Sequence, residues 1–272
     1  MIISNKKPLV SIIMMSYNHA HLISDSIESV LSQSYENLEL IIIDDYSLDN
    51  IDQVVNKFKQ LDDRIIFIKN EYNMGIAGTF NKALRKSQGK YVAPLNADDY
   101  WQANDKILKQ VTFLERNSKY VMVGNFVENV NIDKMHYDFQ NYYTNNEDIK
   151  KQILRSNQFS FPSVLIKADL LKKIGGKETE FPYAGDLLLW LKLGQFGKFK
   201  NFPSYWTGRR LTGVNIGETK RVAQVKEVIK IITRYRNQYP GYMKALLKYK
   251  FQVILFSLPV GIIKKIRQIR KL

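Results

Sequence analysis

Buried-strand and amphipathic-helix patterns alternate along the first part of this chain, and this alternation restricts the fold more than any other feature of the sequence. Nearly continuous apolar runs, which are typical of strands covered on both faces, occupy residues 9–16, 38–43, 65–68 and 91–95. Segments with apolar residues at helical spacing lie between these runs, at 21–33, 50–61 and 76–87. Four repeats with short connections predict an α/β fold, with a parallel sheet, helices on both of its faces and right-handed crossovers.

The pattern becomes less regular after the fourth strand. Residues 128–148 are polar, rich in Asn and Tyr, and without a clear period, so we interpret them as a variable loop or hairpin. Gly175 and Gly176 follow a short helical pattern and predict a C-cap. The remaining predicted helices are 105–117, 149–156, 168–174, 186–193 and a basic helical region from Glu218 onward, and the remaining predicted strands are 120–127, 163–166 and 198–202.

Polar side chains follow three of the predicted strands. They are Tyr17 and Asn18, then Asp44 and Asp45, then Asn96, Asp98 and Asp99. In open parallel sheets, ligands bind outside the carboxyl ends of the strands. The sequence therefore predicts one ligand site built from all three segments.

The adjacent carboxylates of Asp98 and Asp99 allow two interpretations. Hard divalent cations prefer carboxylate oxygens, so the pair fits a cation that bridges two phosphates. Acids also stabilise a helix N-terminus through the helix dipole. The same alternative applies to the acids after the second strand, where we interpret Asp49 as mainly a cap for the next helix. Asp45 is better placed to accept a hydrogen bond from a ligand N–H.

Several common chemistries have no motif in the sequence. There is no cysteine, which excludes disulfides and thiolate metal sites, and no Walker-type loop, GxGxxG, GxSxG or HExxH pattern occurs. The three histidines do not have the spacing of a metal site. Covalent hydrolase chemistry is therefore not supported.

The net charge of +15 is concentrated at the C-terminus. Residues 242–272 contain eight Lys and Arg and no acid, around an apolar centre at 251–263 that is too short to cross a bilayer. This predicts a helix that lies on an anionic membrane surface; the alternative is a terminal helix packed on the domain with a solvated basic face. The aromatic residues are not spaced for base stacking, so nucleic acid is not an expected partner. The N-terminus has no signal-peptide pattern, and a cytoplasmic location is expected.

Several ordered motifs of the sequence resemble glycosyltransferase family 2. The residues that carry the resemblance are 10–18 (VSIIMMSYN), 28–35 (ESVLSQSY), 38–49 (LELIIIDDYSLD), 73–75 (NMG), 89–92 (GKYV) and 96–99 (NADD). The resemblance covers about 8–210 and is strongest over the first 105 residues. It implies a GT-A fold at 8–215, with a donor half at about 8–127 and an acceptor half at about 128–215, followed by the helical membrane-associating region 216–272.

The resemblance also implies roles for the polar residues of the donor half. Tyr17 matches the residue that stacks on the nucleotide base, and Asp45 matches the one that binds the base, usually uracil. Asp98 matches the metal-binding second acid of the DxD motif, with Mn²⁺ or Mg²⁺ as the metal. Asn96 replaces the first acid of that motif; it is expected to contact the ribose and Asp99 to assist in metal binding. Asn18 and Asn73 complete the donor-binding residues expected here.

The expected catalytic base is Asp186, ahead of an apolar helix that contains Trp190, although Gly185 replaces the acid that usually precedes it. The alternative role of Asp186 is an N-cap of that helix. Arg209 and Arg210 match the segment that lines the diphosphate, with Arg210 assigned to the donor, and Thr212 stands at the expected position of a histidine.

Taken together, the resemblance implies an inverting, metal-assisted hexosyl- or N-acetylhexosaminyltransferase that uses a UDP-sugar. A lipid-linked oligosaccharide is the expected acceptor, in bacterial surface polysaccharide or glycan synthesis, with the enzyme peripheral on the inner face of the cell membrane. The alternatives are a sugar nucleotidyltransferase, which requires a Gly-rich basic loop that 16–19 does not provide, and a binding protein without catalysis. The sequence carries no prediction of oligomeric state.

Overall fold

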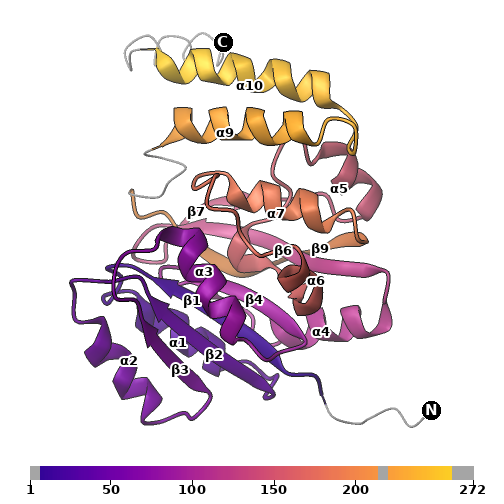
Figure 1. The fold of residues 1–272 in the computed structure, drawn as a ribbon. Helices are drawn as coiled ribbons and strands as arrows, with labels where there is room; N and C mark the ends of the chain where they lie inside the picture. Colours follow the sequence, from indigo (N-terminus) through magenta and orange to yellow (C-terminus); the bar gives the residue numbers. More distant parts are fainter. Residues whose placement is uncertain (1–6, 214–219, 259–272) are drawn as a thin grey trace.

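Four parallel strands form the centre of the computed structural model, which describes residues 7–213 and 220–258 (Figure 1). They lie in the order β3-β2-β1-β4. The strands are β1 (Val10–Ser16), β2 (Leu38–Asp44), β3 (Ile65–Lys69) and β4 (Tyr91–Asn96), and the helices between them are α1 (Ile23–Leu31), α2 (Ile51–Lys59) and α3 (Gly75–Lys86). The predicted α/β class, with a parallel sheet between helices, is confirmed.

Alternate residues of the central strands face two different helical layers. Ile12 and Ile42 pack with α1 and α2, whereas Ile13 and Ile43 pack in a second cluster with α3. Both faces are therefore apolar, as the continuous hydrophobic runs predict, because side chains alternate between the faces of a strand.

Beyond β4 the sheet becomes mixed. Within the described residues the strands form one nine-stranded sheet, which continues from β4 through β8, β6 and β9 to β5, with β7 paired to β6. Strand β8 is antiparallel to β4 and β6, and β6 and β9 are parallel. The elements are β5 (Tyr100–Trp101), α4 (Lys106–Arg116), β6 (Tyr120–Val130), β7 (His136–Gln140), α5 (Asn146–Gln152), the 3₁₀ turn η1 (Phe161–Ser163), β8 (Leu165–Lys167), α6 (Ala168–Lys173), α7 (Gly185–Leu193) and β9 (Lys198–Arg210).

Three predicted boundaries differ in the structure. The 128–148 segment contains the β6–β7 hairpin, and α5 begins earlier than predicted because the side chain of Asn145 caps it by accepting from Asp148 N. Strand β9 continues from the predicted 198–202 to Arg210 because β6 offers a partner along its length. The C-cap after α6 is confirmed: Gly175 N and Gly176 N donate to Lys172 O and Leu171 O, both at 3.0 Å, in a Schellman arrangement.

Two C-terminal helices, α9 (Arg221–Arg234) and α10 (Tyr242–Ser257), lie beyond α7 as successive layers on one side of the sheet (Figure 1). Ile231, Ile232 and Tyr249 belong to the same buried cluster as Ile13 of β1. The predicted start of the basic helical region, at Glu218, lies outside the described residues. The last part of the predicted basic tail, 259–272, also lies outside them. Within the described part of the chain, no helix has the length and apolarity that a membrane span requires.

Candidate functional site

A cleft of about 1510 Å³ opens at the carboxyl edge of the parallel strands. The strand register aligns Ser16 with Asp44 and Met15 with Asn96, so the segments after β1, β2 and β4 begin at the same level. The predicted site residues that line the cleft are Tyr17, Asn18, Asp45, Asn96, Asp98, Asp99 and Asp186. The structure thus brings together the three strand-end segments, as the strand-end argument predicts, and adds Asp186 from a fourth segment.

At one end of the cleft, Asp45 is held by residues that follow β3. Its Oδ1 accepts from Asn70 Nδ2 at 2.8 Å and from Met74 N at 2.7 Å. Asn73 is exposed and does not belong to the lining; its Oδ1 accepts from Gly75 N at 3.1 Å and shapes the turn that presents Met74. Tyr17, which is 46% exposed, also lines the cleft.

The loops after β1 and β2 fix one another. Asn18 adopts φ 58°, a left-handed conformation that Asn tolerates better than most residues. Its side-chain Oδ1 accepts from Leu48 N at 2.9 Å, and its own N–H donates to Ser47 Oγ at 2.8 Å. The predicted helix-capping role of Asp49 is wrong: Asn50 is the N-cap of α2, and Asp49 Oδ2 instead accepts from Ala20 N at 2.8 Å.

The acid pair does not begin a helix. Strand β5 follows it directly, and the N-cap of α4 is Asp105, so the helix-dipole interpretation of Asp98 and Asp99 is wrong. The carboxylate of Asp99 accepts from Asn96 Nδ2 at 2.9 Å and from Arg210 N at 3.1 Å. Burial and the negative charge of Asp98 raise the pKa of Asp99 to about 8.

Asp98 and Asp99 can hold a divalent cation only together with ligands from outside the described chain. Among the described residues, no group of three or more His, Cys, Asp or Glu side chains could hold a metal. Asp98 and Asp99 nevertheless line the cleft, and their mutual repulsion is relieved by a bound cation. The pair therefore fits a cation whose other ligands are oxygens of a bound substrate or water.

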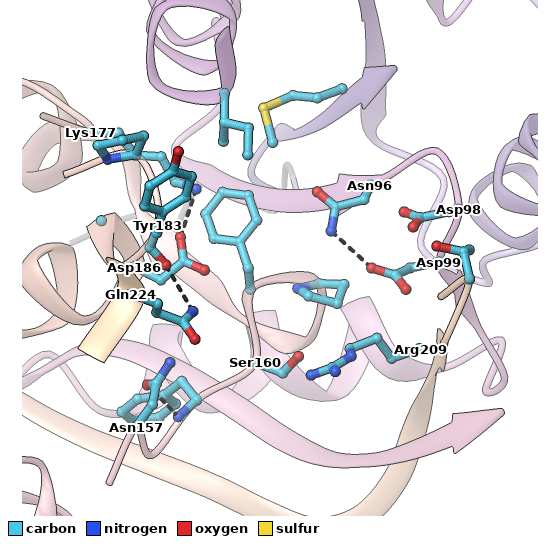
Figure 2. A pocket seen from close by; sticks show the side chains of 18 of the residues that line it. Asn96, Asp98, Asp99, Asn157, Ser160, Lys177, Tyr183, Asp186, Arg209 and Gln224 are labelled. Atoms are coloured by element: carbon cyan, nitrogen blue, oxygen red, sulfur yellow. Dashed lines mark hydrogen bonds and ion pairs between the residues drawn. The ribbon is translucent and has the colours of Figure 1, made fainter. Parts of the chain in front are cut away.

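The two neighbouring arginines of β9 point in different directions. Arg209 lines the cleft beside the acid pair (Figure 2). Arg210 is fully buried; it pairs with Asp25, and its Nη1 donates to Asp98 O at 3.0 Å. Arg210 therefore contacts the backbone of the acid pair from the protein interior.

Asp186 lies on the opposite wall of the cleft from Asp98 and Asp99 (Figure 2). Ala184 is the N-cap of α7 and Asp186 is in its first turn, so the alternative N-cap role of Asp186 is wrong. Its Oδ1 pairs with Lys177 Nζ at 2.6 Å, and the Asp186 side chain remains 35% exposed.

Lys177 is a site residue that sequence reasoning missed. Its side chain is only 5% exposed, and its Nζ lies 3.5 Å from the ring centroid of Phe161. Asn81 of α3 accepts from Lys177 N at 2.9 Å and donates to Lys177 O at 2.7 Å. The one available signal was a lysine immediately after the Gly175-Gly176 turn, nine positions before the predicted base.

Helix α9 also contacts the wall of the cleft that carries Asp186. Glu227 Oε2 accepts from Tyr183 N at 2.9 Å and Ala184 N at 2.8 Å, and Gln224 Nε2 donates to Tyr183 O at 2.9 Å. Glu227 thus satisfies backbone N–H groups at the start of α7, where no side chain of the helix itself forms a cap.

The chain is similar in sequence to known glycosyltransferases. The model for glycosyl transferase family 2 matches residues 11–175. A relative from Escherichia coli, UDP-Glc:alpha-D-GlcNAc-diphosphoundecaprenol beta-1,3-glucosyltransferase WfaP, is 36% identical over 68% of this chain and 70% of its own length.

Solved structures confirm the fold. Staphylococcus aureus TarS 1–349 in complex with UDP-GlcNAc is similar over 93% of this chain and 76% of its own, with a TM-score of 0.72 and 16% identity. The mannosyltransferase PcManGT from Pyrobaculum calidifontis, in complex with GDP-Man and Mn²⁺, is similar over 90% of this chain and 70% of its own, with a TM-score of 0.66 and 19% identity. The GT-A type architecture that the motifs imply is thereby established.

Proposed function

Since the chain belongs to glycosyltransferase family 2, we propose that it transfers a hexosyl or N-acetylhexosaminyl group from a UDP-sugar to an acceptor hydroxyl, with inversion at the anomeric carbon. One observation carries the proposal: acids from three separate segments line a single cleft. They are Asp45, the pair Asp98 and Asp99, and Asp186 on the opposite wall.

The donor would lie along the carboxyl edge of the sheet. The Tyr17 ring would stack on the uracil, and Asp45, whose Oδ1 is fixed by Asn70 and Met74, would accept from the uracil N–H with its other oxygen. Asn18 and Asn96 would border the ribose, and Arg209 would face the diphosphate, for which a guanidinium is well suited.

Asp98, assisted by Asp99, would hold Mn²⁺ or Mg²⁺. When bound, the cation would neutralise charge on the departing diphosphate. TarS with UDP-GlcNAc and the mannosyltransferase with GDP-Man and Mn²⁺ support a nucleotide-sugar donor and a divalent cation for this fold.

In the reaction, Asp186 would accept the proton of the acceptor hydroxyl. The acceptor oxygen then bonds to the anomeric carbon, and the bond from that carbon to the phosphate oxygen breaks. The nucleoside diphosphate leaves with the electron pair. Lys177 would keep the Asp186 carboxylate in place through Oδ1.

For the acceptor, we propose a sugar on a lipid diphosphate. The name of WfaP gives a GlcNAc-diphosphoundecaprenol acceptor for that relative, and an undecaprenol chain is apolar enough to remain in a bilayer. The enzyme would therefore act at the inner face of the cell membrane, in surface polysaccharide or glycan synthesis.

The test is transfer by purified protein, with UDP-glucose and UDP-GlcNAc screened as donors with Mn²⁺. Asp186→Asn is expected to lower transfer by about 10²–10⁴-fold, because the general base is lost, and to keep the thermal shift that UDP produces. Asp98→Ala is expected to lose transfer and the Mn²⁺-dependent part of that shift.

Asp63→Asn, at an exposed position outside the cleft lining, serves as the matched control and should transfer like the wild type. Full transfer by both Asp186→Asn and Asp98→Ala would overturn the mechanism. A thermal shift with UDP-sugars but no transfer by the wild type would indicate a binding protein.

A further inference from the structure

Helix α10 is the outermost layer of the described molecule (Figure 1). Its inner face packs on α9 through Ala245 and Tyr249, which are buried, and through the partly buried Tyr242 and Val253. An outermost helix of this kind usually carries polar residues on its other face.

The outer face of α10 is apolar instead. Met243, Leu247, Phe251 and Ile254 are 62%, 64%, 50% and 62% exposed. At about 100° per residue these positions form one stripe, on the side of the helix opposite Ala245 and Tyr249. We call these four residues the α10 stripe. Four large apolar side chains in a row are an exposed patch rather than scattered surface residues.

Lysines border the α10 stripe. Lys244 lies along one side and Lys250 along the other, both exposed. Lys248, beyond Lys244, instead donates from its Nζ to Arg155 O at 2.6 Å. Helix α10 contains no acidic residue, and the sequence after it adds Lys264, Lys265, Arg267, Arg270 and Lys271, again without an acid. An apolar stripe between cations is complementary to a lipid bilayer that has an apolar interior and anionic headgroups.

We propose that the α10 stripe inserts into the interfacial region of an anionic lipid bilayer, with Lys244 and Lys250 at the headgroups. Amphipathic helices with lysines beside a Leu and Phe face bind membranes in this way. A second copy of the chain fits less well, because pairing two stripes would bring their bordering lysines together.

The proposal places the membrane contact of the predicted region 242–272 on the outer face of one helix, which begins at Tyr242. It deepens the proposed function, since a membrane-embedded acceptor requires an enzyme at the surface. Vesicle binding itself needs neither donor nor acceptor, so the two proposals can fail separately.

The test is co-sedimentation of the full chain with vesicles of phosphatidylcholine containing phosphatidylglycerol, and with pure phosphatidylcholine. The wild type should bind the anionic vesicles, and added salt should weaken the binding. Leu247→Ser is expected to reduce the partition by about tenfold, because one inserted leucine is lost. Lys244→Gln with Lys250→Gln should weaken binding to anionic vesicles only.

The matched control is Leu61→Ser, because Leu61 is 85% exposed and lies after α2, far along the chain from α10. Met243→Ser is the second stripe variant if Leu247→Ser fails to fold. Equal partition of both stripe variants and the wild type would overturn the proposal. The proposal would also be overturned if the wild type did not bind vesicles but formed a dimer, and if the stripe variants dissociated that dimer. Vesicle binding without transferase activity would instead count against the proposed function alone.

Discussion

Lys177 forms an ion pair with Asp186, the proposed catalytic base. Its ammonium is buried against Phe161 and lies 2.6 Å from Asp186 Oδ1. We predict that Lys177→Met lowers kcat by about 10–100-fold, because the proposed base loses the group that orients it, while KM for the donor stays within about twofold. Steady-state kinetics measures both values.

Lys173→Met is the control for this variant, since Lys173 is exposed on the nearby helix α6. A merely structural role of Lys177 would change kcat and KM together or lower the melting temperature without a selective loss of kcat. Unchanged kcat would remove Lys177 from the site.

The residues at the strand ends were predictable because a strand end fixes where a side chain lies. Lys177 was not, because its position depends on Asn81, 96 residues earlier in the chain. Neighbouring strand residues such as Arg209 and Arg210 point to opposite faces, but the sequence did not indicate which of the two faces the cleft. The predicted strand ended at residue 202, and register irregularities in the earlier part of β9 prevent counting of side-chain alternation from its start.

At the scale of elements, two helix-end glycines should respond in opposite ways to the same substitution. Gly176 has φ +68°, and a Cβ there would lie 2.2 Å from Asn81 Oδ1; Gly185, the first residue of α7, has no atom within 4 Å of the added Cβ. We predict that Gly176→Ala destabilises the protein by more than about 1 kcal/mol and that Gly185→Ala stabilises it by about 0.4–1 kcal/mol. Urea unfolding of the two variants measures the difference, and a stabilised Gly176→Ala would contradict the left-handed turn.

The elements of the first half were predictable because each strand and helix has its own local hydrophobic period. The extent of β9 and the β6–β7 hairpin depended on partners distant in sequence, so the polar segment 128–148 allowed no choice between loop and hairpin.

At the scale of the whole molecule, helix α9 contacts the segment that leads into α7. Glu227 of α9 accepts from two backbone N–H groups just before α7, which carries Asp186. We predict that Glu227→Ala costs about 1–2 kcal/mol of unfolding free energy, because these donors lose their partner, and that it lowers transfer activity. Thermal unfolding and the transferase assay measure the two effects.

Lys226→Ala changes the exposed neighbour on the same helix and should leave both quantities near those of the wild type. If Glu227→Ala matched this control, α9 would have no part in positioning α7. The sequence predicted a helical C-terminal region, but it could not indicate that α9 would reach the proposed catalytic wall.

Helix α3 holds residues on two sides of the proposed donor site. Thr79 and Lys82 hydrogen-bond Asn70, which holds Asp45, and Asn81 holds the backbone of Lys177. These three side chains come from one turn of the helix, because residues 79–82 rise by only about 4.5 Å. A movement of this turn would therefore displace the proposed base-binding acid and the partner of the proposed catalytic base together, so that α3 would couple the donor and acceptor sites mechanically.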